Sequence, residues 1–229
     1  MTTFGAPMAE LFNRSRLLVL DFAHISPHIP PEENIAAFFE KLQAMGQNPR
    51  EPQHRQVFNE QMLERTGARY LVSQYSEDRS AMLAGSAIAR EGRTYHLGID
   101  IFARDQEAVF APCDGQIVVS SFEPGAHTYG NYVILQPDDL ALPFIFFGHL
   151  ASEKHGLGHV TVGEQIGQLG NFEPMENGGW SRHLHLQLLT ELPPTGEAPI
   201  GYSSLNDLPK NQQRFPDPMS LFPEWKIAR

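Results

Sequence analysis

The sequence predicts a mainly β protein, α+β overall, with an antiparallel β domain after a mixed α/β segment. Two observations favour this class. The 229 residues include 19 glycines and 18 prolines, a content typical of chains with many tight turns. After Arg93 the apolar runs become short and are bounded by Gly, Pro, Asn and Asp, as in antiparallel sheets. We therefore expect an N-terminal extension over residues 1–90 and a β domain over residues 91–229.

The N-terminal extension should contain one strand and two helices. Residues 16–22 (RLLVLDF) form an apolar run of strand length. Residues 30–46 carry apolar side chains at helical spacing, on a face made of Ile35, Phe38, Phe39, Leu42 and Met45. Residues 58–65 are predicted as a second helix that ends at Gly67, whereas residues 76–90 fit either helix or loop. The apolar helix face needs a partner, so we expect the extension to pack on the β domain.

The β domain is expected to contain seven short strands. Each is an apolar run of four to seven residues between turn-forming residues, which is the pattern of hairpins rather than of long helices. The runs cover residues 96–102, 108–111, 116–122, 131–135, 143–147, 165–169 and 183–189.

Composition and charge exclude several classes of function. The chain has 17 Lys and Arg against 27 Asp and Glu, a net charge of −10, which disfavours nucleic acid and anionic bilayers as partners. No apolar stretch approaches the roughly 18–20 residues of a membrane span. The single cysteine, Cys113, excludes an intrachain disulfide and a Cys-based zinc finger, and we interpret it as a packing residue. The oligomeric state is left open.

The apolar run near the N-terminus does not predict a secretion signal. It ends at Asp21 after four residues, whereas the apolar core of a signal peptide spans about 7–15. We therefore expect a cytoplasmic protein, with export by another route left open.

Histidines and an aspartate are placed on strands where they could meet. In residues 96–102, His96, Gly98 and Asp100 alternate with apolar residues and so share one face of a strand. On a straight strand His96 and Asp100 would lie about 13 Å apart, too far for one metal ion. A bend or bulge at Gly98 would bring the two side chains together.

A second pair of histidines follows the same period of two. His183 and His185 point to one face of the last predicted strand, about 6.6–6.8 Å apart along it, while Leu184 points to the core. His149 follows a very apolar strand (FIFFG). Each of these motifs alone could occur by chance in a chain of this composition. Their order and their flanking residues therefore decide the interpretation.

The order and flanks resemble the zinc metallopeptidases of the M23, lysostaphin-type family. The resemblance covers residues 95–221 and rests on collinear blocks: HLGIDI (96–101), VFAPCDGQIV (109–118), YGNYVI (129–134), FGHL (147–150), VGEQIG (162–167) and HLHL (183–186). The segments LVLD (18–21), YSEDR (75–79) and NGGW (177–180) are more similar to the M23 domain found fused to class III aminotransferases.

This resemblance implies a fold, a reaction and a set of site residues. The fold would be an antiparallel M23 peptidase domain of the barrel-sandwich hybrid type, and the protein a zinc-dependent endopeptidase. His96, Asp100 and His185 would bind Zn²⁺, an open three-ligand set of the catalytic kind. His149 and His183 would be the catalytic pair, because no His-Glu-x-x-His helix supplies a general base. Which of the two is the base stays open.

The substrate implied by the family is a peptide, of a small-residue or cell-wall (peptidoglycan) type. Two departures from the family pattern bear on its choice. Phe147 stands where the family often has tyrosine, two residues before His149. The usual small polar run before the His-x-His pair is replaced by GWSR (179–182). Both changes affect the expected walls of the substrate groove more than the chemistry.

Other interpretations of the β domain are weaker, although one stays open. A biotinyl or lipoyl carrier needs a lysine at a hairpin tip. The single lysine of residues 96–209, Lys154, lies outside any such turn. A cupin-type metal site would need an acid closer to His185 than Glu191. An M23-like module that binds glycan, peptide or a partner protein without catalysis remains the alternative to the peptidase.

Overall fold

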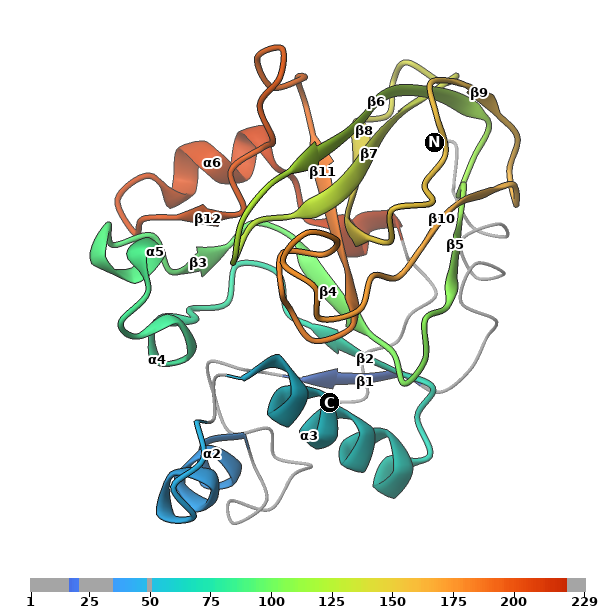
Figure 1. The fold of residues 1–229 in the computed structure, drawn as a ribbon. Helices are drawn as coiled ribbons and strands as arrows, with labels where there is room; N and C mark the ends of the chain where they lie inside the picture. The colour runs from blue at the N-terminus through green and yellow to red at the C-terminus, as the bar shows by residue number, and fades with distance from the viewer. Residues whose placement is uncertain (1–16, 21–34, 49–50, 222–229) are drawn as a thin grey trace.

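The computed structural model describes residues 17–20, 35–48 and 51–221. Its centre is an eight-stranded sheet with the strand order β1-β2-β4-β11-β8-β7-β6-β9 (Figure 1). Neighbouring strands are antiparallel except for β1 and β2, which are parallel. The predicted fold class, mainly antiparallel β with few helices, is confirmed.

The β domain contains the seven expected runs and more. The strands that contribute to the large sheet from this region are β4 (Ile99–Phe102), β6 (Gly115–Glu123), β7 (Gly130–Pro137), β8 (Phe144–Leu150), β9 (Gly158–Val160) and β11 (His183–Leu189). Two small sheets flank it: β5 (Ala108–Phe110) pairs with β10 (Gln165–Gln168), and β3 (Tyr95–His96) with β12 (Tyr202–Ser203). The chain continues into α6 (Leu208–Arg214) and a 3₁₀ turn, η2 (Pro218–Leu221).

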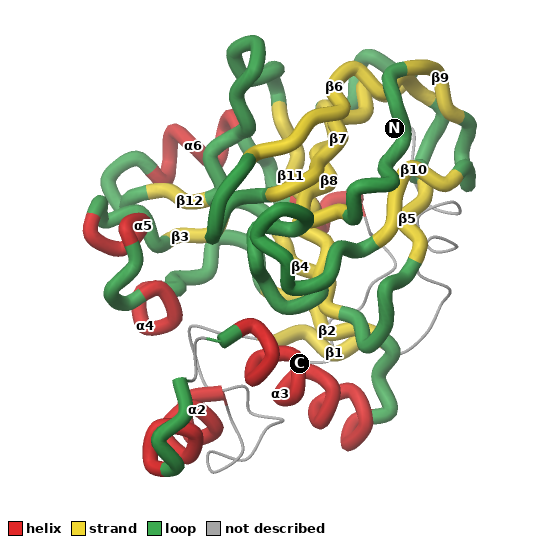
Figure 2. The backbone as a smooth tube through the Cα atoms, in the orientation of Figure 1, coloured by secondary structure: helices red, strands yellow, loops and turns green. Residues whose placement is uncertain are grey.

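The described part of the extension is joined to the large sheet. Its elements are β1 (Leu17–Leu20), α2 (Ile35–Ala44), α3 (Pro52–Thr66), β2 (Tyr70–Ser73), α4 (Ser80–Leu83) and α5 (Ala87–Arg90). Helix α3 ends at Gly67 in the left-handed conformation (φ 62°), as the sequence predicts. Strand β2 pairs with β4, and α3 lies beside β2 (Figure 2). The strands on the two sides of the predicted domain boundary near residue 90 therefore belong to one continuous sheet. That residue 90 separates two domains stays a prediction.

The predicted apolar face of the first helix is only partly described. Leu42 is buried, whereas Met45 is 62% exposed because it lies just beyond the end of α2. The side chains of Ile35, Phe38 and Phe39 lie outside those that the structure describes. Within the described residues, no helix has both the length and the apolar character needed to cross a bilayer.

The two faces of the sheet carry different sets of side chains. One face holds the main core, which includes Ile99, Ile101, Val133, Leu184 and Leu186. The opposite face carries two smaller apolar clusters, one around Phe58, Leu71 and Phe102, the other around Leu97, Tyr132, Ile134 and Phe146. Because side chains alternate along a strand, Asp100, His183 and His185 fall on this second face, opposite the main core. The candidate site is thus set on a rigid sheet between apolar neighbours.

Candidate metal centre and active site

A bend between β3 and β4 brings His96 and Asp100 together. Residues 97 and 98 separate the two strands, and His96 Nε2 lies 3.5 Å from Asp100 Oδ1. The expectation that the chain bends at Gly98 is confirmed. A Cβ atom at Gly98 would lie 2.7 Å from the His185 ring and from the Leu186 carbonyl, so this close approach of three strands requires glycine.

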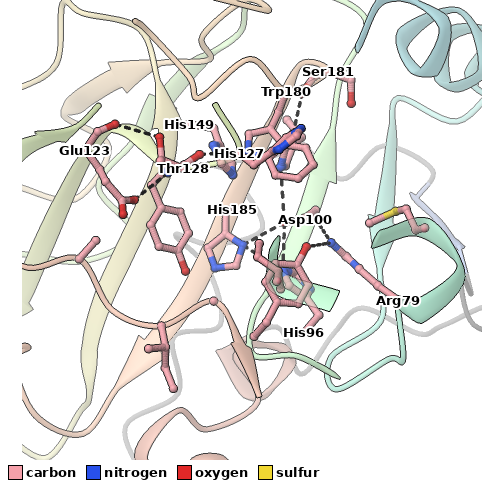
Figure 3. Close-up of a pocket in the computed structure, with 18 of the residues that line it drawn as sticks. Arg79, His96, Asp100, Glu123, His127, Thr128, His149, Trp180, Ser181 and His185 are labelled. Atoms are coloured by element: carbon pink, nitrogen blue, oxygen red, sulfur yellow. Dashed lines mark hydrogen bonds and ion pairs between the residues drawn. The ribbon is translucent and has the colours of Figure 1, made fainter. Parts of the chain in front are cut away.

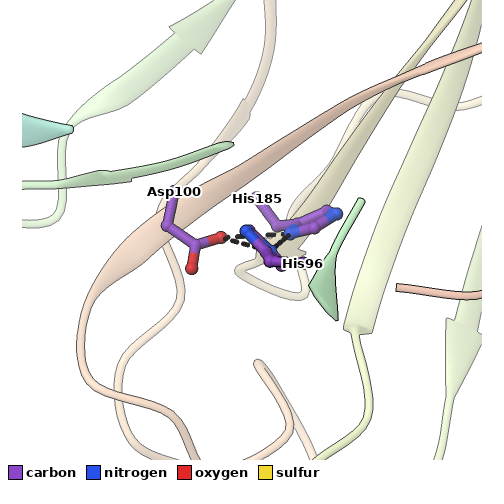
Figure 4. A group of neighbouring side chains, drawn as sticks. All are labelled: His96, Asp100 and His185. Carbon is purple, nitrogen blue, oxygen red and sulfur yellow. Dashed lines mark hydrogen bonds and ion pairs between the residues drawn. The ribbon is translucent and has the colours of Figure 1, made fainter. Parts of the chain in front are cut away.

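His185 completes a compact group with these two residues. In the sheet register it lies directly opposite Asp100, and its Nδ1 is 3.0 Å from Asp100 Oδ1 and 3.1 Å from His96 Nε2 (Figure 4). All three side chains are buried. The ligand atoms of the three lie within 4.8 Å of one another, so the structure brings together the three residues that the sequence predicts as metal ligands.

Gln187 fixes which nitrogen of His185 faces this group. The Gln187 side-chain amide donates to the Ile200 carbonyl (3.1 Å), so its oxygen is turned toward His185 Nε2 at 2.9 Å. The same oxygen accepts a hydrogen bond from the Tyr129 hydroxyl. His185 Nε2 must therefore carry the proton, which leaves the lone pair on Nδ1. Nδ1 is the atom that faces Asp100 and His96.

The donor set suits a zinc ion. An imidazole lone pair and a carboxylate oxygen that face each other in a buried space repel unless a cation or a proton lies between them. Two imidazoles with one carboxylate form a known three-ligand set of catalytic zinc sites. An oxygen or nitrogen partner on the second ring nitrogen is usual for such ligands. His185 has this partner in Gln187, whereas His96 Nδ1 has none among the described residues.

Asp100 is held on its other side by residues of the extension. Arg79 Nη1 donates to Asp100 Oδ2 at 2.6 Å, and Arg79 Nε donates to Glu77 at 2.6 Å. Ser73 Oγ accepts from the Asp100 main-chain N–H at 2.7 Å. Burial alone would raise the pKa of the Asp100 carboxyl, but the Arg79 guanidinium and the site imidazoles outweigh it and hold this pKa well below its usual value. Asp100 is therefore a carboxylate at neutral pH.

His149 and His183 lie side by side next to the candidate ligands. Their ring centroids are 4.4 Å apart, and His183 Nε2 lies 3.7 Å from Asp100 Oδ1. Each ring is anchored through Nδ1, which donates to the carbonyl of Asn177 (2.9 Å) or of Ser181 (2.6 Å). Both Nε2 atoms are thus acceptors. The structure places both predicted catalytic histidines beside the group of three.

The electrostatics keep both rings neutral. Burial, with the neighbouring His183, holds the pKa of His149 well below its usual value. Burial lowers the pKa of His183 to about 4, although Asp100 opposes the shift. His149 also has a left-handed main chain (φ 62°), which is uncommon for a non-glycine residue and concentrates at functional sites. Neutral imidazoles at fixed positions are suited to accept protons.

The site opens into a cavity of about 260 Å³ (Figure 3). Its walls include residues that the sequence does not predict as site residues: Arg55, Arg79, Met82, His127, Trp180 and Tyr202. Trp180 packs near His127 and His149, so the GWSR departure does form a wall. A second cavity of about 150 Å³ between α4, α5 and residues 179–181 shares several of these walls. The extension therefore shapes the groove.

The remaining histidines take no part in the group of three. His155 lies near Glu164, and His159, in β9, lies near Asp138 at the surface. His54 is bonded to the Asn48 carbonyl. His127 is exposed and also borders the cavity. His24 and His28 lie outside the described residues.

Comparison with known proteins agrees with this geometry. Residues 94–196 match the model of peptidase family M23. The matched residues include the four histidines and the aspartate of the site, but the match begins after Arg79. Comparison with curated proteins finds no match.

Several solved structures are similar to part of the chain. The catalytic domain of the antimicrobial peptidase lysostaphin from Staphylococcus simulans is 21% identical, over 52% of this chain and 80% of that one, with a TM-score of 0.36. A prophage-encoded M23 protein from Enterococcus faecalis is 19% identical over 48% and 75%, with a TM-score of 0.36. A zinc-containing peptidase from Vibrio cholerae is 23% identical over 42% and 27%, with a TM-score of 0.34.

Proposed function

We propose that this protein is a zinc-dependent endopeptidase. The observation that carries the proposal is the convergence of His96, Asp100 and His185, with two further histidines of fixed orientation beside them. A structural zinc site would close its coordination with a fourth protein ligand, whereas a three-ligand set leaves a position open. The match to peptidase family M23 supports the same class of reaction.

The proposed ligand atoms are His96 Nε2, Asp100 Oδ1 and His185 Nδ1. Zinc would act as a Lewis acid, which lowers the pKa of bound water to about 7 and polarises a carbonyl group. The protein contributes the geometry: Gln187 orients His185, and the bend at Gly98 brings His96 to Asp100. None of these residues needs to move a proton.

Proton transfer is assigned to His149 and His183. Their Nε2 atoms face the cavity as acceptors, while their Nδ1 protons are held by main-chain carbonyls. One of them takes the proton of the attacking water and returns it to the leaving amine. The other, at 4.4 Å between ring centroids, is a neutral acceptor at Nε2 and orients the attacking water by accepting a hydrogen bond from it. The order of these two roles is left unassigned.

We propose small-residue or cell-wall-type peptides as the substrate class. This choice follows the M23 match. The finer resemblance to the M23 domain found fused to class III aminotransferases rests on residues 18–21, 75–79 and 177–180 and is part of the proposal. Trp180 and residues of the extension, among them Arg55, Arg79 and Met82, line the groove in which such a peptide would bind. A cytoplasmic location is part of the same proposal and would require an intracellular peptide substrate.

Metal analysis combined with a hydrolysis assay tests the proposal. The purified protein should contain one zinc per chain and cleave a glycine-rich peptide, and Asp100→Ala should lose both. Stoichiometric zinc without hydrolysis of any peptide tried would favour the binding module instead. A protein that keeps its zinc at this site after Asp100→Ala would overturn the ligand assignment.

A further inference from the structure

Arg79 connects the extension to the metal centre. It lies just before α4 and outside the M23-matched residues, yet its side chain is only 3% exposed. Its guanidinium donates three hydrogen bonds: Nη1 to Asp100 Oδ2 (2.6 Å), Nε to Glu77 (2.6 Å), and a longer one from Nη1 to the Tyr202 hydroxyl (3.3 Å). Buried charges at such distances hold one another in a single geometry.

These contacts give the two oxygens of the Asp100 carboxylate different partners. Oδ2 is taken by Arg79, whereas Oδ1 faces His96 and His185. The main chain of Asp100 is fixed as well, because its N–H donates to Ser73 Oγ. Both Ser73 and Arg79 come from the extension. With Oδ2 turned to Arg79, Oδ1 is the oxygen that the carboxylate presents to a cation between the three side chains.

We propose that Arg79 is a positioning residue of the metal centre, which holds Asp100 so that it binds zinc through Oδ1 alone. The inference rests on the proposed function in that it takes zinc as the ion at His96, Asp100 and His185. Single-oxygen binding leaves room around the ion for water and a substrate carbonyl. Lysine would keep the charge of Arg79, but a single ammonium lacks the planar fork that reaches Glu77 and Asp100 together.

The chemistry of the pair explains why the extension belongs to the enzyme. A buried carboxylate without a partner is costly and would turn toward any available donor. Arg79 gives Asp100 a fixed partner before the ion arrives, so the ligand is oriented in advance. Outer partners of metal ligands typically contribute a factor of about 10–100 to metal affinity. Glu77, which contacts the far side of the same guanidinium, holds Arg79 in turn.

The test compares zinc affinities of the full-length protein and its variants by competition with a chromophoric chelator. Arg79→Met should weaken zinc binding about 10–100-fold, with Arg79→Lys and Glu77→Gln between it and the wild type. The matched control is Arg69→Met. Arg69 also joins the extension to the β domain, through Glu107 at 3.1 Å, but it does not line the cavity. This control should keep the wild-type affinity.

A second readout separates positioning from general destabilisation. The visible absorption of the Co²⁺-substituted protein depends on coordination number, and it should weaken in Arg79→Met as Asp100 becomes free to bind through both oxygens. A folded Arg79→Met with wild-type zinc affinity and an unchanged Co²⁺ spectrum would overturn the inference. If Arg79→Met does not fold, wild-type affinity in both Arg79→Lys and Glu77→Gln would overturn it.

The outcomes also distinguish this inference from the proposed function. A wild type that binds zinc in an Arg79-dependent way but cleaves no peptide would overturn the peptidase and support the positioning role. A wild type that hydrolyses peptides, with zinc affinity independent of Arg79, would do the reverse. A wild type that binds no zinc would overturn both.

Discussion

Hydrogen bonds from outside the group of three decide which nitrogen is the acceptor in His149, His183 and His185. His149 and His183 are held by main-chain carbonyls, and His185 by Gln187. A neutral imidazole has one donor and one acceptor, so fixing the donor fixes the acceptor as well. Because the histidines differ in anchoring, we expect them to differ in role, which can be tested one residue at a time.

Metal binding and catalysis should separate at His149. The His149→Ala variant removes a ring that is not part of the candidate ligand set, so it should keep one zinc per chain. Hydrolysis of a peptide that the wild type cleaves should fall by about 10²–10⁴, the usual effect of losing a positioned acid or base. The measurements are metal content and steady-state rates.

The control for this experiment is His185→Ala, which should lose zinc and activity together. Equal zinc loss in the two variants would show that the roles are wrongly divided. So would full activity in His149→Ala.

Cys113 should be chemically inert in the folded protein. Its side chain is half-buried against the main core, and burial, with Asp114 and Asp138, raises the pKa of its thiol to about 12. A free cysteine has a pKa of about 8.5, so at pH 8 the reactive thiolate should be scarcer by on the order of 10³. Alkylation by iodoacetamide should be slow in buffer and fast in denaturant. Similar rates in both would contradict the burial of this thiol.

The sequence indicates the residues of the site better than their partners. His96, Asp100, His149, His183 and His185 are predicted from period-two spacing and the family blocks. The sequence does not indicate Arg79 and Gln187 as partners of the site. Arg79 contacts a residue far away in the sequence, and the Gln187 amide belongs to no motif of its own. Arg79 and Asp100 are 21 residues apart, and no local pattern joins them.

At the scale of elements, the close approach of β3, β4 and β11 depends on Gly98. Gly98→Ala would place a Cβ atom 2.7 Å from the His185 ring and from a main-chain oxygen, so β4 or His185 must shift. Overpacking of this kind typically costs about 1–3 kcal/mol of stability. We expect that loss in denaturant unfolding, together with weaker zinc binding in the chelator competition.

Gly156→Ala is the matched control, since a Cβ atom there meets nothing within 4 Å and the main chain needs no left-handed conformation. Its stability should stay within about 0.5 kcal/mol of the wild type. A Gly98→Ala protein that behaves like this control would show that the strands tolerate a side chain at the bend.

Elements with clear periodicity are predicted well, and short elements are not. The runs at 116–122 and 183–189 match β6 and β11 closely. Residues 76–90, ambiguous in the sequence, contain two four-residue helices, α4 and α5, which are too short to show a helical repeat. Strands β3 and β12 have two residues each and exist through their mutual pairing, which the sequence does not display.

At the scale of the molecule, the extension and the β domain should be inseparable. Deleting residues 1–90 would uncover the edge of β4, where Ile101 and Phe102 pair with β2, and would remove Arg79. Open, apolar strand edges promote aggregation. We expect residues 91–229 to aggregate or to melt at a lower temperature, as measured by light scattering and thermal unfolding.

A point substitution gives the same test without truncation. Leu71 is fully buried and packs with Phe58, Met62, Leu63 and Phe102, so Leu71→Ala should cost about 2–5 kcal/mol. A fragment of residues 91–229 as soluble and as stable as the whole chain would contradict the packing of the extension, as would a Leu71→Ala protein of unchanged stability.

The position of β11 has a consequence for biosynthesis. It is the last strand of the large sheet to be made, yet it lies in the middle, between β4 and β8. Until residue 189 has left the ribosome, a nascent chain holds two half-sheets with unpaired inner edges, and His185 has not met Asp100. Such intermediates are prone to misassembly. The group of His96, Asp100 and His185 therefore forms in the same step that closes the sheet.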